Sequence, residues 1–240
     1  MTSAVVAEAR GAVLVVSLDR PESRNAITAD MAQAVARHLD RLDESPDLRV
    51  AVIHGRNGYF SSGMDLKRFE RTGERPLDPQ RGSGGLAWVP PRKPIIAAVD
   101  GYALGLGFEM VLACDLVVAA SDAVLGLPEV KHGLVAGGGG AMRLPRRQPR
   151  AAAMEMLLTG RPCAAARLHE LGLVSQLAAP GEALDMAVAL AAEVAAMDVD
   201  AVVLTKAIAL ESREWPESEL FAWQEPRLSA FLDARRSAGS

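Results

Sequence analysis

Short apolar runs rich in β-branched residues, each followed by a glycine or proline turn, dominate the first half of the chain. The clearest are AVLVVSL at residues 12–18, RVAVI at 49–53 and PIIAAV at 94–99. Runs of this length bounded by turn residues are typical of buried strands. Between the first two runs the apolar residues take helical spacing, with Thr28 as a candidate N-cap. The pattern predicts an α/β fold.

Helical patterns take over in the second half, at residues 151–159, 164–171, 182–197 and 200–213. This order favours an α/β core of residues 1–180 followed by a helical region of residues 181–240. Residues 70–93 are rich in glycine, proline and charge, with little periodicity. We expect a loop there, the least ordered part of the chain.

The composition suits a chain that buries a sizeable core, since 50% of the 240 residues are apolar and 23% are charged. A net charge of −4 gives no general attraction to nucleic acid. No apolar run approaches the roughly 20 residues of a membrane-spanning helix, and residues 1–10 lack the pattern of a secretion signal. Cys114 and Cys163 are too few for a disulfide framework or a metal cluster. We therefore expect a cytoplasmic protein that binds neither nucleic acid nor membrane.

Several catalytic motifs are missing, namely the P-loop, the GxSxG nucleophile elbow, HExxH and any CxxC pair. Gly105 and Gly107 begin a dinucleotide fingerprint, but Met110 stands in place of its third glycine. The four histidines have no spacing typical of metal ligands. These observations argue against several large classes of enzyme.

Two glycine turns follow predicted strands, in FSSGMDL at residues 60–66 and in GYALGLGFE at residues 101–109. A junction from strand through glycine turn to helix exposes backbone N–H groups at the start of the helix, where the helix dipole favours negative charge. Two such junctions facing each other would form an oxyanion hole. The candidate donors are the N–H groups of Met64 and Leu106, because each follows a glycine.

Two acidic residues, Glu109 and Glu129, stand among apolar neighbours close to these turns. Taken alone, an acid in the first turn of a helix serves to complement the helix dipole. Taken together, the two suggest a pair of carboxyl groups flanking one pocket. Burial and mutual repulsion would then raise a pKa into the range useful for general acid–base catalysis.

At these residues the sequence resembles the crotonase, or enoyl-CoA hydratase/isomerase, superfamily. The similarity covers most of the chain, in motifs that follow the family's order and spacing: RPESRNAIT at residues 20–28, FSSGMDL at 60–66, KPIIAAVDGYALGLGFEMVLACD at 93–115, LPEVKHGL at 127–134, GGAMRLPR at 139–146 and EMLLTGRPCAAARLHELGLV at 155–174. The resemblance implies a crotonase-like spiral of repeated β-β-α units. It also implies a C-terminal helical region that forms a homotrimer or a dimer of trimers.

The resemblance further implies an acyl-CoA thioester substrate, whose enolate the N–H groups of Met64 and Leu106 stabilise. Glu109 and Glu129 match the two catalytic glutamates of hydratases, in which the first activates water and the second delivers the proton at Cα. The implied reaction is the reversible hydration of a trans-2-enoyl-CoA to a 3-hydroxyacyl-CoA. It requires no metal or redox cofactor, since coenzyme A is part of the substrate.

Arg24 and Lys67 match basic positions that approach the phosphates of coenzyme A in the family, although each alone is an ordinary surface cation. Three features depart from the family pattern. Leu106 replaces a glycine, Ala136 replaces a proline, and the ending after Glu225 is short and is expected to lack the family's final helix.

Alternative activities remain open within this resemblance. An enoyl-CoA isomerase uses the same enolate but usually needs the second glutamate alone, so the retained pair favours a hydratase. The stretches GFEMVLACD, LPEVKHGLV and RLPR are also similar to carnitinyl-CoA dehydratases, which keep both glutamates. A non-catalytic acyl-CoA-binding protein is a third hypothesis, suggested by the short ending and Leu106.

Overall fold

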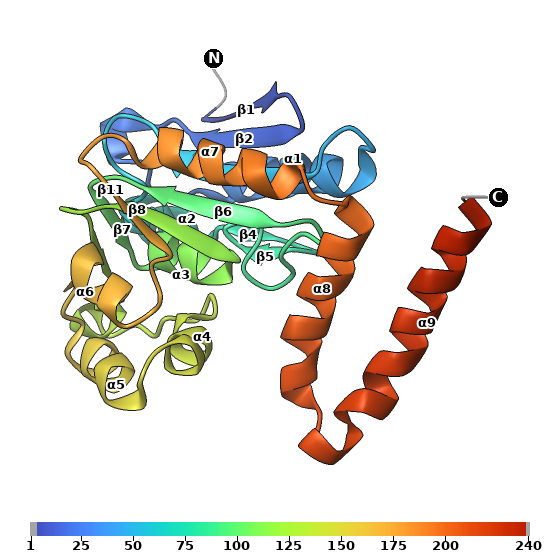
Figure 1. Cartoon of the computed structure of the whole chain (residues 1–240). Helices are drawn as coiled ribbons and strands as arrows, with labels where there is room; N and C mark the ends of the chain where they lie inside the picture. Colours follow the sequence, from blue (N-terminus) through green and yellow to red (C-terminus); the bar gives the residue numbers. More distant parts are fainter. Residues whose placement is uncertain (1–3, 239–240) are drawn as a thin grey trace. The chain divides into compact units, whose positions relative to one another are not determined.

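The chain forms two compact units in a computed structural model that describes residues 4–238 (Figure 1). The first unit is Met1–Ala196 and the second is Met197–Ser240. All strands of the described residues lie in the first unit, and the described part of the second consists of helices and short turns. The predicted α/β organisation, with strands before helices, is confirmed in this order of elements.

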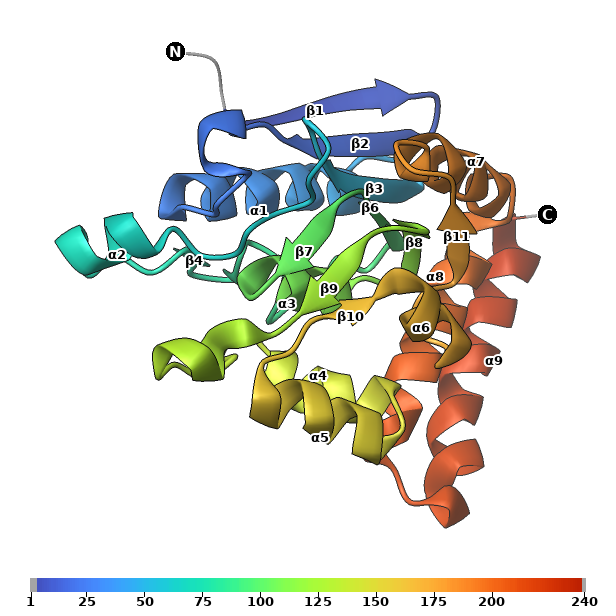
Figure 2. The same ribbon diagram turned by 90° about the vertical axis from the view of Figure 1, so that its left-hand side faces the viewer.

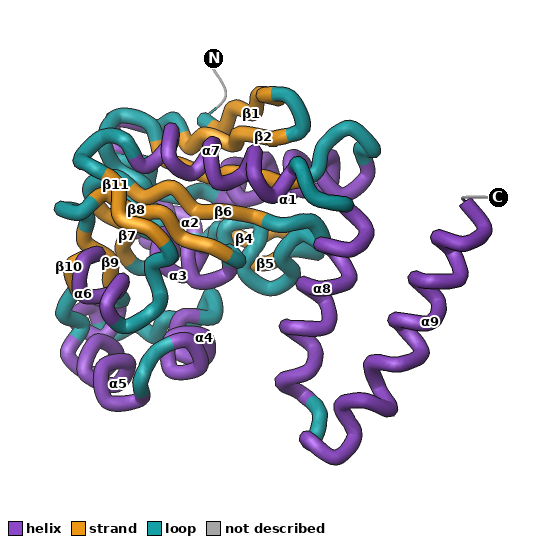
Figure 3. Tube along the Cα trace, in the orientation of Figure 1, coloured by secondary structure: helices purple, strands orange, loops and turns teal. Residues whose placement is uncertain are grey.

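The main sheet is nearly all parallel and is coloured orange in Figure 3. Its six strands, in spatial order, are β1 (Val5–Arg10), β2 (Val13–Leu18), β3 (Val50–Gly55), β6 (Ile95–Val99), β8 (Leu116–Ala120) and β11 (Gln176–Ala178). Within this sheet β1 and β2 pair antiparallel, and every other neighbouring pair is parallel. The central strands are buried along almost their whole length, which explains why their sequences are continuous apolar runs. The strands predicted at residues 12–18, 49–53 and 94–99 are confirmed as β2, β3 and β6.

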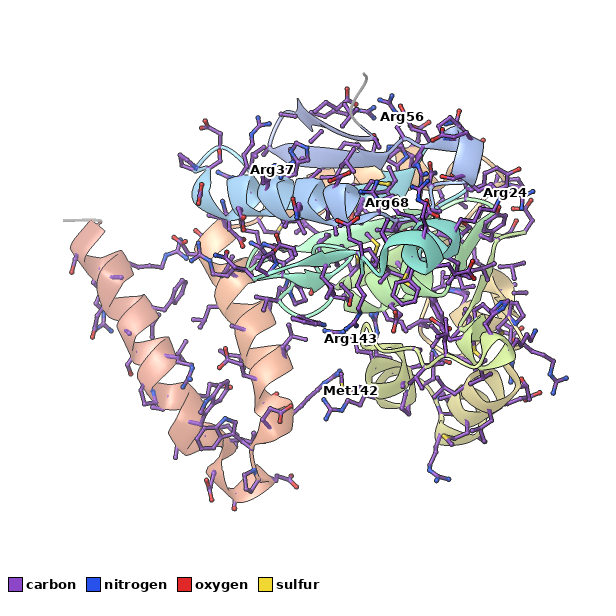
Figure 4. The ribbon with its side chains drawn as sticks, turned by 180° about the vertical axis from the view of Figure 1, so that it is seen from behind. Arg24, Arg37, Arg56, Arg68, Met142 and Arg143 are labelled. Carbon is purple, nitrogen blue, oxygen red and sulfur yellow. The ribbon has the colours of Figure 1, made fainter. Side chains whose placement is uncertain are left out.

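Helices cover both faces of the main sheet. Helix α1 (Ala29–Glu44) begins at Thr28, whose Oγ1 accepts the Met31 N–H at 3.3 Å, so the predicted N-cap is confirmed. It packs on one face, and α7 (Ala183–Ala195) packs on the other. In Figure 1 α7 lies in front of the sheet, and in Figure 4 α1 lies in front. Because α7 belongs to the sheet's packing, the first unit extends past the predicted boundary at residues 180 and 181.

A smaller sheet brings two later segments of the chain together. Its three strands are β7 (Tyr102–Leu104), β9 (Val124–Gly126) and β10 (Cys163–Ala164). Strands β7 and β9 lie side by side and parallel (Figure 2). In their register Leu104 is opposite Gly126. Parallel strands end at the same edge of a sheet. Helix α3 (Leu106–Ala113) follows β7, and the short helix η2 (Pro128–His132) follows β9, so both begin at that edge.

The segment at residues 70–93, predicted to be a poorly ordered loop, is largely held in place. It contains the end of α2 (Leu66–Thr72) and a small hairpin of β4 (Leu77–Asp78) and β5 (Gly82–Ser83), and residues 81–87 are buried. The buried Arg81 guanidinium donates to Asp40 at 2.7 Å and to Asp43 at 3.0 Å, both on α1. Most of residues 73–93 lie outside helices and strands, as predicted for a loop. The expectation of poor order is wrong, because these long-range ion pairs fix the segment against α1.

The remaining helices of the first unit follow the glycine-rich stretch: α4 (Gly140–Arg147), α5 (Arg150–Thr159) and α6 (Ala165–Glu170). Gly160 ends α5 with φ of +62°, as predicted from the sequence. Within residues 4–238, no helix combines the length and apolarity needed to cross a membrane, and no three His, Cys, Asp or Glu side chains are grouped as metal ligands.

The second unit contains α8 (Val199–Glu211), two short turns at Ser212–Glu214 and Glu217–Glu219, and α9 (Leu220–Ala238). Inside this unit the Arg227 guanidinium lies 4.1 Å from the centre of the Trp223 ring and donates to the Trp223 carbonyl at 2.8 Å. The expectation that the chain lacks a final helix is wrong, since α9 has 19 residues.

Candidate active site

A cavity of about 300 Å³ opens at the edge of the smaller sheet where α3 and η2 begin. It is within the size range of small-ligand sites. Its lining includes Ser62, Gly63, Met64, Leu66, Phe69, Arg75, Pro76, Leu77, Ser83, Gly105, Leu106, Glu109, Pro128, Glu129, His132, Leu134 and Val135. The predicted donors and both predicted carboxyl groups therefore line one cavity, although they come from segments far apart in the sequence.

The first glycine turn directs the backbone N–H of Met64. Gly63 has φ of +101°, and its carbonyl accepts the Ile27 N–H at 2.8 Å. Because the Gly63–Met64 peptide is trans, its N–H points the opposite way from this carbonyl, away from Ile27. The neighbouring Asp65 N–H bonds back to the Ile27 carbonyl. Within residues 4–238 the Met64 N–H has no acceptor.

The second glycine turn directs the backbone N–H of Leu106 in the same manner. Gly105 has φ of +52°, and its carbonyl accepts the Glu109 N–H at 3.0 Å as the first hydrogen bond of α3. Leu106 is the first residue of this helix, so its N–H has no acceptor inside the helix. The Gly105 N–H is itself held by the Gly126 carbonyl at 2.9 Å, which ties the turn to β9.

The two turns pack directly against each other. A Cβ atom on Gly63 would lie 2.8 Å from the Leu104 carbonyl oxygen and 3.5 Å from the Leu106 nitrogen. A Cβ atom on Gly105 would lie 3.9 Å from Gly63 Cα. Any side chain at Gly63 would therefore force the turns apart. The structure therefore places Met64 and Leu106, which both line the cavity, next to each other.

Glu109 is buried in the first turn of α3, with only 3% of its surface exposed. Its Oε1 accepts the Gly140 N–H at 2.9 Å. Burial raises the pKa of Glu109, while hydrogen bonds from the N–H groups of Gly140 and Gly138 and the charge of Arg143 act to lower it. A Cβ atom on Gly138 would lie 2.5 Å from Glu109 Oε2, so this backbone approaches the carboxyl more closely than other residues allow.

Glu129 lies in η2 on the other side of the second turn, where a Cβ atom on Gly105 would be 3.4 Å from its Oε1. Its Oε2 is buried and has no hydrogen-bond partner within residues 4–238. Burial, reinforced by the negative charge of Glu109, raises the pKa of Glu129 to about 7. A carboxyl with this pKa holds or releases a proton near neutral pH.

Arg24 and Lys67 do not line the cavity. Both side chains are exposed, Arg24 next to the 3₁₀ turn at Pro21–Ser23 and Lys67 in the first turn of α2. Figure 4 shows Arg24 at the edge of the molecule, whereas Arg143 lies below the sheet at the start of α4.

Several functional candidates were missed from the sequence. The main ones are the N–H groups that hold Glu109, contributed by the GGGG stretch, and Arg143, whose Nη1 folds over Gly139 in that stretch. The polyglycine stretch was the available signal, because consecutive glycines expose backbone donors. Arg75 and Ser83 also line the cavity, and they lie in a segment without a recognisable motif. His132 lines it too, but in the motif LPEVKHGL only Glu129 was singled out.

The arrangement combines two carboxyl groups of unequal environment with two backbone donors in one partly apolar cavity. Backbone N–H groups aimed at a common point stabilise a developing oxyanion, such as an enolate. Carboxyl groups with separated proton affinities provide an acid and a base. The site therefore has the chemistry of a class of enzymes that move protons next to a carbonyl group.

Comparisons with known proteins agree with this class. The enoyl-CoA hydratase/isomerase family profile matches residues 8–234. Enoyl-CoA hydratase EchA19 of Mycobacterium tuberculosis is 37% identical over 89% of this chain and 83% of its own length. Carnitinyl-CoA dehydratase of Salmonella enteritidis is 39% identical over 87% of this chain and 81% of its own length. The chain belongs to the enoyl-CoA hydratase/isomerase family.

A solved structure supports the same assignment. The crystal structure of an enoyl-CoA hydratase from Mycobacterium tuberculosis H37Rv is 50% identical to this chain, with a TM-score of 0.90 over 93% of this chain and 88% of that one. This similarity confirms the crotonase-like α/β fold predicted from the sequence.

Proposed function

We propose that the chain is an enoyl-CoA hydratase, a hydro-lyase that adds water reversibly across the 2,3 double bond of a trans-2-enoyl-CoA. The product is a 3-hydroxyacyl-CoA. The observation that carries the proposal is that the buried Glu109, the half-buried Glu129 and two backbone N–H groups without an acceptor among the described residues surround one cavity. Relatives named enoyl-CoA hydratase support it independently.

In the proposed mechanism the thioester oxygen accepts hydrogen bonds from the N–H groups of Met64 and Leu106. These bonds strengthen as negative charge develops on the oxygen, so they lower the barrier rather than merely binding substrate. Ionised Glu109 takes a proton from water as the water oxygen bonds to Cβ. Protonated Glu129 gives its proton to Cα as the enolate collapses. The glutamate pair holds one proton before and after the reaction, and no metal or redox cofactor is needed.

The assignment of acid and base follows from the surroundings of the two carboxyls. Burial raises the pKa of Glu109, but the N–H groups of Gly140 and Gly138 and the charge of Arg143 oppose this rise and favour its ionised form. Glu129 lacks a partner for its buried Oε2 within residues 4–238, and its pKa of about 7 favours the protonated form below neutral pH. Hydration requires a base at Glu109, to take a proton from water, and an acid at Glu129, to give a proton to Cα.

We further propose that Arg24 and Lys67 bind phosphates of coenzyme A. Both are exposed cations outside the cavity, and the nucleotide end of coenzyme A would extend beyond a cavity of about 300 Å³. The proposed assembly is a homotrimer or a dimer of trimers formed through the C-terminal helical region of residues 181–240. The proposed cytoplasmic location rests on the small number of cysteines.

A carnitinyl-CoA dehydratase is the second candidate, favoured by the 39% identity to the Salmonella enzyme of that name. It would use the same two carboxyl groups and the same donors on a different acyl group. An enoyl-CoA isomerase and a non-catalytic acyl-CoA-binding protein are weaker alternatives, because neither accounts for two glutamates lining one cavity.

The test is the loss of ultraviolet absorption of the conjugated thioester when purified protein is added to crotonyl-CoA. Wild-type protein is expected to hydrate the substrate, while Glu129→Gln is expected to lose activity by orders of magnitude and to remain folded by circular dichroism. Crotonobetainyl-CoA in parallel distinguishes the second candidate. Hydration of crotonyl-CoA by the Glu129→Gln variant at the wild-type rate would reject the proposed mechanism.

A further inference from the structure

Ser61 lies where the two donor turns meet, and its side chain is completely buried. Its backbone pairs with β7, since the Leu104 N–H donates to the Ser61 carbonyl at 3.0 Å and the Ser61 N–H donates to the Tyr102 carbonyl at 3.1 Å. Strand β7 leads directly into the second turn. Ser61 itself lies at the start of the first turn, so this one residue connects the first turn to the strand that precedes the second.

The Ser61 hydroxyl adds two hydrogen bonds of its own. It donates to the Asn25 carbonyl at 2.7 Å and accepts the Gly63 N–H at 3.1 Å. The Gly63 carbonyl is held separately by the Ile27 N–H at 2.8 Å. Gly63 is therefore fixed at both of its polar backbone groups, and the orientation of the following peptide, which carries the Met64 N–H, is fixed with it.

The same side chain also contacts the second turn. A Cβ atom on Gly107, in the first turn of α3, would lie 2.8 Å from Ser61 Cβ and 3.1 Å from its Oγ. Gly107 thus allows α3 to pack on Ser61 without an intervening side chain. The Leu106 N–H belongs to the residue just before Gly107, so the contact sets the distance between the two donors.

We propose that Ser61 is a positioning residue of the oxyanion hole, and that its hydroxyl keeps the Met64 and Leu106 N–H groups aimed at one oxygen atom. The proposal rests on the donor role given to these two residues under the proposed function. Ser61 itself does not touch the substrate, because it lies behind the turns and does not line the cavity. Its effect is on the alignment of the donors, which matters most in the transition state.

The matched control is Ser17, a second buried hydroxyl in the same unit. Ser17 lies on β2, far in the sequence from either turn, and its Oγ forms a hydrogen bond of 2.7 Å with His54 Nε2 on β3; neither residue lines the cavity. Ser17→Ala and Ser61→Ala each remove one buried side-chain hydrogen-bonding group. Ser61→Ala breaks two buried hydrogen bonds and Ser17→Ala breaks one, so urea midpoints are measured for both variants and their kinetics are compared where both are folded. Any remaining kinetic difference reports position rather than loss of folding.

The readout is the absorption of 4-dimethylaminocinnamoyl-CoA, whose band moves to longer wavelength when its thioester carbonyl is polarised. Wild-type and Ser17→Ala protein are expected to give the same red shift on binding. Ser61→Ala is expected to give a clearly smaller shift and a kcat for crotonyl-CoA reduced roughly 10- to 100-fold, with KM changed much less. Ser61→Cys keeps a side chain of similar size with a weaker hydrogen-bonding group, and is expected to be intermediate.

A full red shift and a wild-type kcat in folded Ser61→Ala would overturn the proposal. If Ser61→Ala does not fold, Ser61→Cys takes its place in the measurement, and an unchanged red shift in that variant overturns the proposal. The absorption measurement does not depend on turnover. A wild-type protein that shifts the probe but does not hydrate crotonyl-CoA would reject the hydratase, while the role of Ser61 would still be decided by the variants. A wild-type protein that binds the probe without a shift would reject the oxyanion hole and the role of Ser61 together.

Discussion

Glu109 and Glu129 face the same cavity with unequal hydrogen bonding. Glu109 Oε1 accepts the Gly140 N–H at 2.9 Å, whereas Glu129 Oε2 is buried without a partner within residues 4–238. The charge of Glu109 also helps raise the pKa of Glu129. The pair therefore holds a single proton most readily on Glu129, and this unequal sharing makes the order of proton transfers predictable.

The pH dependence of hydration follows from this pair. The active form carries one proton in total, so kcat/KM is expected to fall as pH rises through about 7, where Glu129 loses its proton. The kcat/KM for dehydration of the 3-hydroxyacyl-CoA should fall over the same pH range, because the overall reaction neither takes up nor releases a proton. A kcat/KM for hydration that stays flat from pH 7 to 9 would contradict this assignment.

Stability should depend on pH through the same carboxyl. The pKa of Glu129 is about 7 when folded and 4.5 as its ordinary value, so the folded state binds more protons between these pH values. The free energy of unfolding therefore falls by roughly 3 kcal/mol as pH rises from 4.5 to 7.

His54 acts in the opposite direction and must be separated from this effect. Burial lowers the pKa of His54 to about 4, so its contribution to stability increases as pH rises through the range from 4 to 6.5. The measurement is urea unfolding of wild type and Glu129→Gln across pH 4 to 8. The stability of the wild type relative to the variant should decline with pH, and a constant difference would refute the buried, proton-binding state of Glu129.

Gly138 and Gly137 form a matched pair for testing the site of Glu109. A Cβ atom on Gly138 would lie 2.5 Å from Glu109 Oε2, whereas one on Gly137 would meet only the Val135 carbonyl at 3.7 Å. Gly138→Ala should displace the Glu109 carboxyl and lower kcat by more than about tenfold. Gly137→Ala should stay within a few-fold of wild type. Equal kcat values for the two variants would mean that the close backbone contact does not position Glu109.

Arg143 should influence activity through the charge state of Glu109. Its positive charge favours the ionised carboxylate, so Arg143→Met should raise the pKa of Glu109 and move the acidic limb of kcat/KM to higher pH. A shift of one pKa unit would reduce the ionised fraction by up to about tenfold near that limb. Arg143→Lys keeps the charge and should stay closer to wild type. Identical acidic limbs in all three proteins would exclude the electrostatic role.

The ion pairs that hold residues 70–93 should contribute strongly to stability. Arg81 and Asp43 have only 9% and 10% of their side chains exposed. Asp43→Ala leaves the guanidinium buried with fewer partners, and should reduce the free energy of unfolding by about 3 kcal/mol. Glu155→Ala removes an exposed pair with Arg161 and should cost less than about 1 kcal/mol. Similar urea midpoints for the two variants would show that the burial of Arg81 contributes little.

Much of the local structure could be predicted because it depends on neighbours in the sequence. Thr28 caps α1 and Gly160 ends α5 through contacts within a few residues. The hairpin within residues 70–93 was missed because its stability comes from Arg81 bonding to Asp40 and Asp43, about forty positions earlier. The composition of a segment does not indicate which distant residues it will contact.

The ending of the chain was misjudged for a different reason. The prediction rested on how short the ending is compared with the family pattern, whereas the chain continues past Glu225 as helix α9, through Pro226. The contacts of Arg227 with Trp223 and Glu211 belong to the helical arrangement of this unit and were not evident from residue order.

The candidate site was predictable in its parts but not in its assembly. The glycines before Met64 and Leu106 marked the donor turns, and the two glutamates were conspicuous among apolar neighbours. Their convergence depends on β7 and β9, strands of three residues each whose parallel pairing no periodicity could indicate. The role of the polyglycine stretch was likewise hidden, because it acts through backbone N–H groups on a carboxyl about thirty positions away.

Because the proposed donors are main-chain groups, selection for the chemistry at the carbonyl and selection for the shape of the acyl pocket act on different parts of the same residues. Met64 and Leu106 offer the thioester oxygen a group that every residue except proline possesses. Both residues also line the cavity in which the acyl group of the proposed substrate would lie. Mutations at these two codons can thus alter which acyl groups fit while the chemistry at the carbonyl is preserved, giving the scaffold a simple route to new substrates.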